Sequence, residues 1–139
     1  MSAVKAFFDT NVLLYLLSAD TAKADRAEEI VAAGGIISVQ VLNEFASVCT
    51  RKLGMSLAEI RDALTPIRTI CSVVPLTEPI HDHALQLAEC YRFSIYDALI
   101  VAAARDADCT ILYSEDMQHG QIIDGVLTLT NPFADPAQR

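Results

Sequence analysis

Short apolar runs alternate with longer helix-like segments along this chain of 139 residues. Each run has the length of a buried strand and is bounded by polar or turn-forming residues. The runs cover residues 4–8, 35–38, 72–76, 110–113 and 126–129. Strands that alternate with helices predict an α/β fold in which helices cover both faces of a parallel sheet. We therefore expect a three-layer arrangement with a central parallel sheet.

The segments between these runs carry start and stop signals of helices. Ser56 and Glu59 are spaced as a capping box, and Pro66 is expected to kink or shorten the helix that this box opens. The other helices are expected at 11–17, at 21–33, between a Ser38 cap and Gly54, at 79–92, and at 96–106 with Ser94 as its cap.

Length and composition favour one domain over residues 1–139, with an irregular tail from about residue 131. Apolar residues make up 53% of the chain, which is enough for a buried core. No apolar run approaches the roughly 20 residues of a membrane span, so no membrane partner is expected. The first residues do not have the pattern of a secretion signal, and we expect a cytoplasmic protein.

Four cysteines are spread along the chain without a CxxC pair. This spacing makes a zinc site improbable and predicts buried free thiols. The cysteines are Cys49, Cys71, Cys90 and Cys109.

Four acidic residues occupy positions that the predicted sheet would bring together. Asp9 directly follows the first strand, and Asp116 lies just after a later one. Glu44 is on the second turn of its helix, and Asp97 is in the first turn of another. Open parallel sheets bind ligands beyond the carboxyl ends of their strands. We therefore expect all four carboxylates at the same edge of the sheet.

Each acid also has a structural interpretation of its own. Asp9 could cap a helix, and Asp97 could complete a capping box with Ser94. Glu44 could be a solvated side chain, and Asp116 lies in a polar turn, where Asp is common. The joint pattern, and none of the four taken alone, favours a site.

Carboxylates packed together repel one another, and a divalent metal ion is the commonest way to offset that repulsion. Metal-dependent phosphoryl chemistry is therefore the leading hypothesis. Asn11 and Ser114 stand next to this set in the sequence and could orient its carboxylates. His119 could contact a phosphate at the rim of the pocket. Tyr96 could stack on a base, although an aromatic residue beside an apolar helix is more often packed.

The formal net charge of −8 argues against a protein that simply coats nucleic acid. It leaves room for an enzyme that acts on nucleic acid through bound metal, provided that the substrate path is locally basic. A basic protein partner, or a merely soluble surface, would also account for the charge. The available cations are Arg51, Lys52, Arg61, Arg68, Arg92 and Arg105.

At these acidic residues the sequence resembles the PIN-domain ribonucleases, and most closely the VapC-type toxins of bacterial toxin–antitoxin pairs. The segments that carry the resemblance are FFDTNVLLYLLS, SVQVLNEFASV, SIYDALIVAAA and LYSEDMQHG. They contain the four acidic positions of the family in the same order, although DTN alone is a weak signal.

The resemblance implies that Asp9, Glu44, Asp97 and Asp116 hold one or two Mg²⁺ or Mn²⁺ ions for endonucleolytic cleavage of RNA. Asn11 and Ser114 match the supporting polar positions of the family. The implied fold is a parallel sheet between helices, often in a homodimer, and the implied partner is a VapB-like antitoxin. With water as the nucleophile, the products should carry a 5′-phosphate and a 3′-hydroxyl.

Other functions remain as alternatives. An aspartyl-phosphate phosphatase would need a second acid where Asn11 stands, and a phospho-accepting signalling domain would need a lysine late in the chain. The lysines are Lys5, Lys23 and Lys52. An RNA-processing PIN nuclease without an antitoxin, or a binding module with a relic acidic pocket, is not excluded by the sequence.

Overall fold

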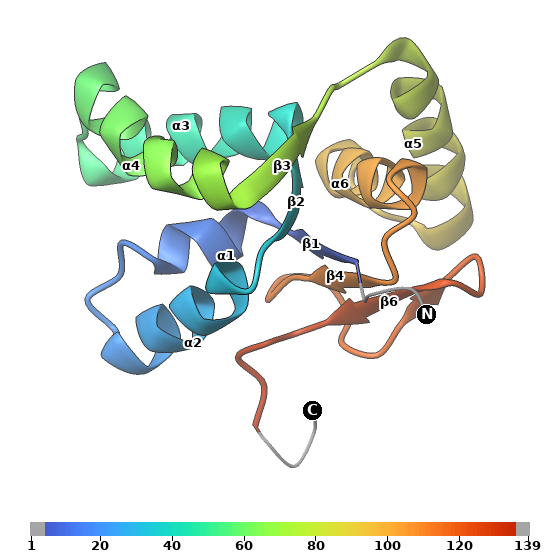
Figure 1. The fold of residues 1–139 in the computed structure, drawn as a ribbon. Coiled ribbons are helices and arrows are strands. Elements are labelled where there is room, and N and C mark those ends of the chain that lie inside the picture. The colour runs from blue at the N-terminus through green and yellow to red at the C-terminus, as the bar shows by residue number, and fades with distance from the viewer. Residues whose placement is uncertain (1–4, 136–139) are drawn as a thin grey trace.

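The computed structural model describes residues 5–135 and shows a sheet between helices (Figure 1). The sheet has six strands in the order β3-β2-β1-β4-β6-β5. Its strands are β1 (Ala6–Phe8), β2 (Gly35–Ser38), β3 (Cys71–Val74), β4 (Ile111–Tyr113), β5 (Ile122–Ile123) and β6 (Leu127–Thr130). The predicted α/β class with a parallel sheet is confirmed.

All neighbouring strands are parallel except β5, which pairs with β6 in the antiparallel direction. The five predicted strands are found with small shifts at their ends. The start of the predicted strand 4–8, Val4, lies outside the described residues. The short edge strand β5 is an addition that the sequence interpretation missed.

Six helices connect the strands within residues 5–135. They are α1 (Thr10–Tyr15), α2 (Thr21–Ala32), α3 (Val39–Leu53), α4 (Leu57–Ile70), α5 (Glu78–Tyr91) and α6 (Ile95–Asp106). In Figure 1, α5 and α6 lie together on one side of the sheet, and α1 and α2 lie on the other. The order of these helices places the start of α1, α3 and α6 near the carboxyl ends of the strands.

Local capping chemistry sets the start of these helices as predicted. The hydroxyls of Ser38, Ser56 and Ser94 each accept a hydrogen bond from the backbone N–H three residues on. At Ser56 the capping box with Glu59 is complete. Gly54 ends α3 in the left-handed conformation that glycine adopts without strain.

The expected shortening of α4 at Pro66 is wrong, because the helix continues to Ile70, and the alternative of a kink at Pro66 stays a prediction. A proline removes one backbone donor and leaves the rest of the ladder in place. Pro66 itself is exposed, whereas Ile67 in the next position is buried in the core. Burial of the Ile67 side chain therefore helps to offset the lost hydrogen bond.

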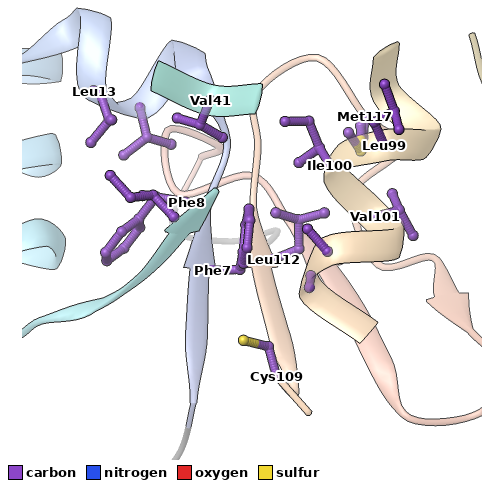
Figure 2. Packing of buried hydrophobic residues seen from close by; sticks show 14 of the residues in the cluster. Phe7, Phe8, Leu13, Val41, Leu99, Ile100, Val101, Cys109, Leu112 and Met117 are labelled. Carbon is purple, nitrogen blue, oxygen red and sulfur yellow. The ribbon is translucent and has the colours of Figure 1, made fainter. Parts of the chain in front are cut away.

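The core lies on both faces of the sheet. Phe7 and Phe8 are adjacent in β1 and fully buried, and their side chains point to opposite faces. Figure 2 shows Phe8 on the side of Leu13 and Phe7 beside Leu112, on the side of α6. Gly35 in β2 is required by this packing, because a Cβ there would meet the Phe8 ring at 2.6 Å.

The prediction of buried free thiols is right for three cysteines and wrong for Cys90, which is exposed. The buried face of α5 runs through Ile80, Ala84 and Leu87 to the half-buried Tyr91, so Cys90 falls on its solvent side. All four thiols are free. Across residues 5–135, none of the helices is long and apolar enough to span a bilayer.

Candidate active site

Asp9 is the most deeply buried acid of the described residues, with 4% of its surface exposed. It follows β1 and is the N-cap of α1, so the expected capping role is real. Its Oδ1 accepts the Thr10 N–H at 2.7 Å, and its Oδ2 accepts the Ser114 hydroxyl at 2.7 Å. Capping occupies one carboxylate oxygen, and the other faces the turn after β4.

Burial raises the pKa of Asp9 from 3.8 to about 7, although the hydrogen bonds from Ser114 and Thr10 oppose the shift. The charges of Asp97 and Glu44 raise the pKa further. Two acids from distant parts of the chain are therefore close enough to act on Asp9. The predicted gathering of carboxylates at one sheet edge begins with this trio.

Glu44 on α3 is half-buried and points toward the start of α1. Its Oε1 lies 3.5 Å from the Thr10 hydroxyl, and its Oε2 accepts the Gln40 amide at 3.0 Å. Burial raises the pKa of Glu44 above its usual range, and the charge of Asp97 adds to this, while the Gln40 hydrogen bond opposes it. The alternative of a freely solvated side chain is therefore wrong.

Asp97 and Asp116 complete the set. Burial raises the pKa of Asp97, and the charge of Asp116 is the next largest cause. The Ser94 hydroxyl accepts the Asp97 N–H at 3.2 Å, but no reciprocal bond from the Ser94 N–H reaches the Asp97 carboxylate within the described residues. The Asp97 carboxylate is partly buried beside another acid, and a hydrogen bond with the Ser94 side chain partly opposes the rise in its pKa.

Asn11 joins two of the acids from opposite ends of the chain. Its amide nitrogen donates to Asp116 Oδ2 at 3.0 Å and to Asp9 Oδ2 at 3.3 Å, and lies 3.5 Å from the Ser114 hydroxyl oxygen. Its Oδ1 accepts the Glu115 N–H at 3.1 Å. Ser114 is buried, and its hydroxyl oxygen accepts the Asp116 N–H. Asn11 and Ser114 therefore hold Asp9 and Asp116 in place, as expected of supporting residues.

His119 binds the backbone near the end of β6. Its Nδ1 accepts the backbone N–H of Asn131 at 2.9 Å, which ties the turn after β4 to the end of β6. The role of His119 at the rim of a pocket stays a prediction.

A cluster that the sequence interpretation missed supports the turn that carries Asp116. Tyr15 donates a hydrogen bond to Glu115, and Lys23 forms an ion pair with Glu115 at 2.7 Å. Lys23 also lies 4.7 Å from the centre of the Tyr15 ring. Burial raises the pKa of Glu115, but the hydrogen bonds from Lys23 and Tyr15 oppose this, and the pKa lies below its usual value. No spacing signal points to this cluster, because Lys23 and Glu115 are 92 residues apart.

The donor set fits a hard divalent cation. The carboxylates of Asp9, Glu44, Asp97 and Asp116, with the neighbouring amide and hydroxyl oxygens, are the ligand types that such ions prefer. A cation would also offset the cost of burying the charges of Asp9, Glu44 and Asp97, which is the main cause of their raised pKa values, and the repulsion from neighbouring acids that adds to it. As the side chains stand in residues 5–135, no three His, Cys, Asp or Glu residues are arranged to hold a metal ion together.

The chain belongs to the PIN domain family, whose model matches residues 6–122 and so contains all four acids. Its fold is similar to that of a toxin–antitoxin complex from Klebsiella pneumoniae, with a TM-score of 0.69 and 21% identity over 93% of this chain and 98% of that one. It is also similar to VapC20 of Mycobacterium tuberculosis, described as a sarcin-ricin loop cleaving toxin, with a TM-score of 0.65 and 20% identity over 78% of this chain and 87% of that one.

A third similar structure is the DNA-bound VapBC of Salmonella typhimurium, with a TM-score of 0.67 and 17% identity over 94% of this chain and 99% of that one. A search of curated proteins found no match. The resemblance to the PIN family is therefore confirmed, and the shared fold is that of VapC-type proteins.

Proposed function

We propose that this protein is a metal-dependent endoribonuclease and the toxin of a toxin–antitoxin pair. The observation that carries the proposal is the electrostatic coupling of four carboxylates from separate elements at one edge of a PIN-type sheet. Asp9, Glu44 and Asp97 each have a raised pKa, and Asp116 is a cause of the shift at Asp97. Perturbed pKa values of this kind cluster at functional sites.

In this proposal, Asp9, Glu44, Asp97 and Asp116 hold one or two Mg²⁺ or Mn²⁺ ions. A bound divalent ion would supply an activated water near neutral pH and offset the charge that develops on the phosphate. Asn11 fixes the direction of the Asp116 and Asp9 carboxylates through its amide, and Ser114 fixes Asp9 through its hydroxyl. None of these residues is needed as a covalent nucleophile.

The substrate and partners follow from the relatives. VapC20 is described as cleaving the sarcin-ricin loop, an RNA element, and this supports RNA as the substrate class. The similar chains from Klebsiella pneumoniae and Salmonella typhimurium belong to toxin–antitoxin assemblies, which supports a VapB-like antitoxin as partner. A homodimer and a cytoplasmic location belong to the same proposal.

The test is cleavage of total cellular RNA by the purified, antitoxin-free protein in Mg²⁺ or Mn²⁺. Asp97→Asn and EDTA should each abolish cleavage, because EDTA removes the metal ion and the substitution removes one of its proposed ligands. Asp106→Asn is the matched control, since Asp106 is an exposed acid at the far end of the same helix. The products should carry a 5′-phosphate. Cleavage that survives EDTA and Asp97→Asn would refute the proposal.

A binding module with a relic pocket is the second candidate. The hydrogen bonds from Asn11 to Asp9 and Asp116 favour it, because they satisfy two carboxylates without a cation. Calorimetric titration with Mn²⁺, together with the cleavage assay, distinguishes the binding module from the nuclease. Metal binding without cleavage of any RNA would support the binding module, and metal binding with cleavage would support the nuclease.

A further inference from the structure

A groove of about 570 Å³ with both polar and apolar walls runs along α3 and includes Glu44 of the candidate active site. Its walls include Gln40, Asn43, Glu44, Ser47 and Arg51 from α3 and Tyr96 from the first turn of α6. The α3 residues are spaced three and four apart, so they lie on one face of the helix. Glu44 is at once a wall of the groove and a member of the acidic set, and Tyr96 immediately precedes Asp97. The groove therefore opens onto the carboxylates.

Arg51 gives this groove a positive charge that the protein does not neutralise. The ion pairs within residues 5–135 use Lys23, Arg26 and Arg105, and none of them involves Arg51. The Arg51 Nε donates to the Ser47 hydroxyl at 3.1 Å, which holds the side chain along the groove. Seven residues of helix put Arg51 roughly 10 Å from Glu44 along the axis. In a chain of net charge −8, a cation at this position attracts an anionic strand toward the acidic edge.

Tyr96 presents an aromatic face at the mouth of the same groove. Its surface is 62% exposed, which is unusual for a tyrosine that contributes to packing. Within residues 5–135, the stacked or tilted ring pairs are formed by other aromatic residues. The side-chain hydrogen bonds of this part of the structure do not involve the Tyr96 hydroxyl. The alternative that Tyr96 is simply a packing residue is therefore wrong.

We propose that this groove binds a single-stranded segment of RNA and feeds it to the acidic site, a proposal that rests on the nuclease function above. Tyr96 stacks on the base next to the phosphate that is cut, and Arg51 binds a phosphate further along the strand. A base can stack on a side chain only when it is unpaired, so the substrate class is a loop or a single strand and not a continuous duplex. The amides of Asn43 and Gln40 line the path between the two contacts.

The test measures binding of a fluorescein-labelled, mixed-sequence RNA of about ten nucleotides, a length within the usual site size of single-strand binders. The host is the full-length Asp97→Asn protein, so that cleavage does not deplete the probe. Tyr96→Ala should weaken binding roughly 5- to 100-fold, as expected for the loss of one stacked base. Tyr96→Phe keeps the ring and should bind like the parent.

Arg51→Ala should weaken binding and also lower the salt dependence, with the slope of log K against log salt falling by about 0.7 for one phosphate contact on a single strand. Tyr96→Ala should leave that slope unchanged, because stacking releases no counterion. Arg61→Ala is the matched control, since Arg61 is an exposed arginine on α4 that does not line the groove. A duplex of the same sequence should bind more weakly than the single strand.

A second measurement does not depend on a loss of affinity. The chain has no tryptophan, so Tyr96→Trp introduces a single fluorophore at the mouth of the groove. Its emission should be quenched when the RNA is added, and the quenching should saturate with the affinity seen by anisotropy. Emission that does not change while the RNA binds would overturn the stacking contact.

The outcomes also separate this proposal from the one on which it rests. If the wild-type protein cleaves RNA and the Tyr96→Ala and Arg51→Ala proteins bind and cleave as well as Arg61→Ala, the groove is not the substrate path but the nuclease stands. Preference for the duplex would overturn the single-strand assignment. If the wild-type protein neither binds nor cleaves any RNA, both proposals fall.

Discussion

In metal-free buffer, replacing Asp9 by asparagine should destabilise the protein at acidic pH and stabilise it at alkaline pH. The wild-type carboxyl has a pKa of about 7 in the folded protein, against an ordinary value of 3.8. Between these two values the folded protein keeps the proton that the unfolded chain has already released. The contribution of Asp9 to the free energy of unfolding is therefore highest below about pH 4 and falls as the pH rises toward 7.

The gap of about 3 pH units corresponds to about 4 kcal/mol of lost stability at pH 8. That is a large part of the 5–15 kcal/mol that typically holds a domain together. Asparagine has no charge to bury, so this loss disappears in the Asp9→Asn protein. The substitution still costs about 1 kcal/mol at pH 5, because its amide faces the Asn11 amide where Asp9 Oδ2 accepts a hydrogen bond.

The assay is urea unfolding of both proteins at several values between about pH 5 and pH 8 in EDTA, followed by circular dichroism. Glu44 and Asp97 also have raised pKa values and titrate in the same direction, so the difference between the two proteins isolates Asp9. The curves should cross, with the wild type more stable at pH 5 and the variant more stable at pH 8. Parallel curves would show that folding does not change the protonation of Asp9 between about pH 5 and pH 8, and would refute the reasoning. Mg²⁺ should raise the free energy of unfolding of the wild type at pH 8 and should raise that of the variant less.

Two further predictions concern the scaffold. Gly35→Ala should cost about 1–3 kcal/mol, because its Cβ would sit 2.6 Å from the Phe8 ring and 2.8 Å from the Ala6 carbonyl oxygen; a urea midpoint equal to that of the wild type would contradict the close approach. Ser56→Ala should cost about 1 kcal/mol, because it removes the hydroxyl that accepts the Glu59 N–H at the start of α4; thermal unfolding checks this, and an unchanged Tm would mean that the cap contributes nothing.

The sequence predicted the parallel strands because they are buried on both faces and read as continuous apolar runs. It missed β5 (Ile122–Ile123) because two residues between glycines carry no periodic signal, and the pairing with β6 exists only in the fold. It was wrong about Pro66 and Cys90 for a related reason. A breaker or an apolar neighbour is a local signal, whereas the end of a helix and the burial of a side chain depend on what packs against them.

The positions of the four acids followed from strand ends and helix starts, so the shared edge could be predicted. The hydrogen bonds and burial around these acids could not be predicted from the sequence. Asn11 reaches Asp116 across 105 positions of the chain, and Tyr15 reaches Glu115 across 100. The raised pKa of Asp9 depends on burial, which no spacing rule supplies.

These long-range contacts give the adjacent acids Glu115 and Asp116 different environments. Glu115 is neutralised by Lys23 and Tyr15, so its charge is compensated outside the candidate site. Asp116 accepts a hydrogen bond from the neutral amide of Asn11 and stays exposed beside Asp97. A neutral donor does not cancel the charge of a carboxylate, and burial first, then the charges of neighbouring acids, raise the pKa values of Asp9, Glu44 and Asp97. Uncompensated charge lowers the stability of the metal-free protein, and the same deficit would be relieved by a divalent cation. The instability predicted for Asp9 at alkaline pH and the affinity proposed for Mg²⁺ or Mn²⁺ are therefore two consequences of one electrostatic imbalance.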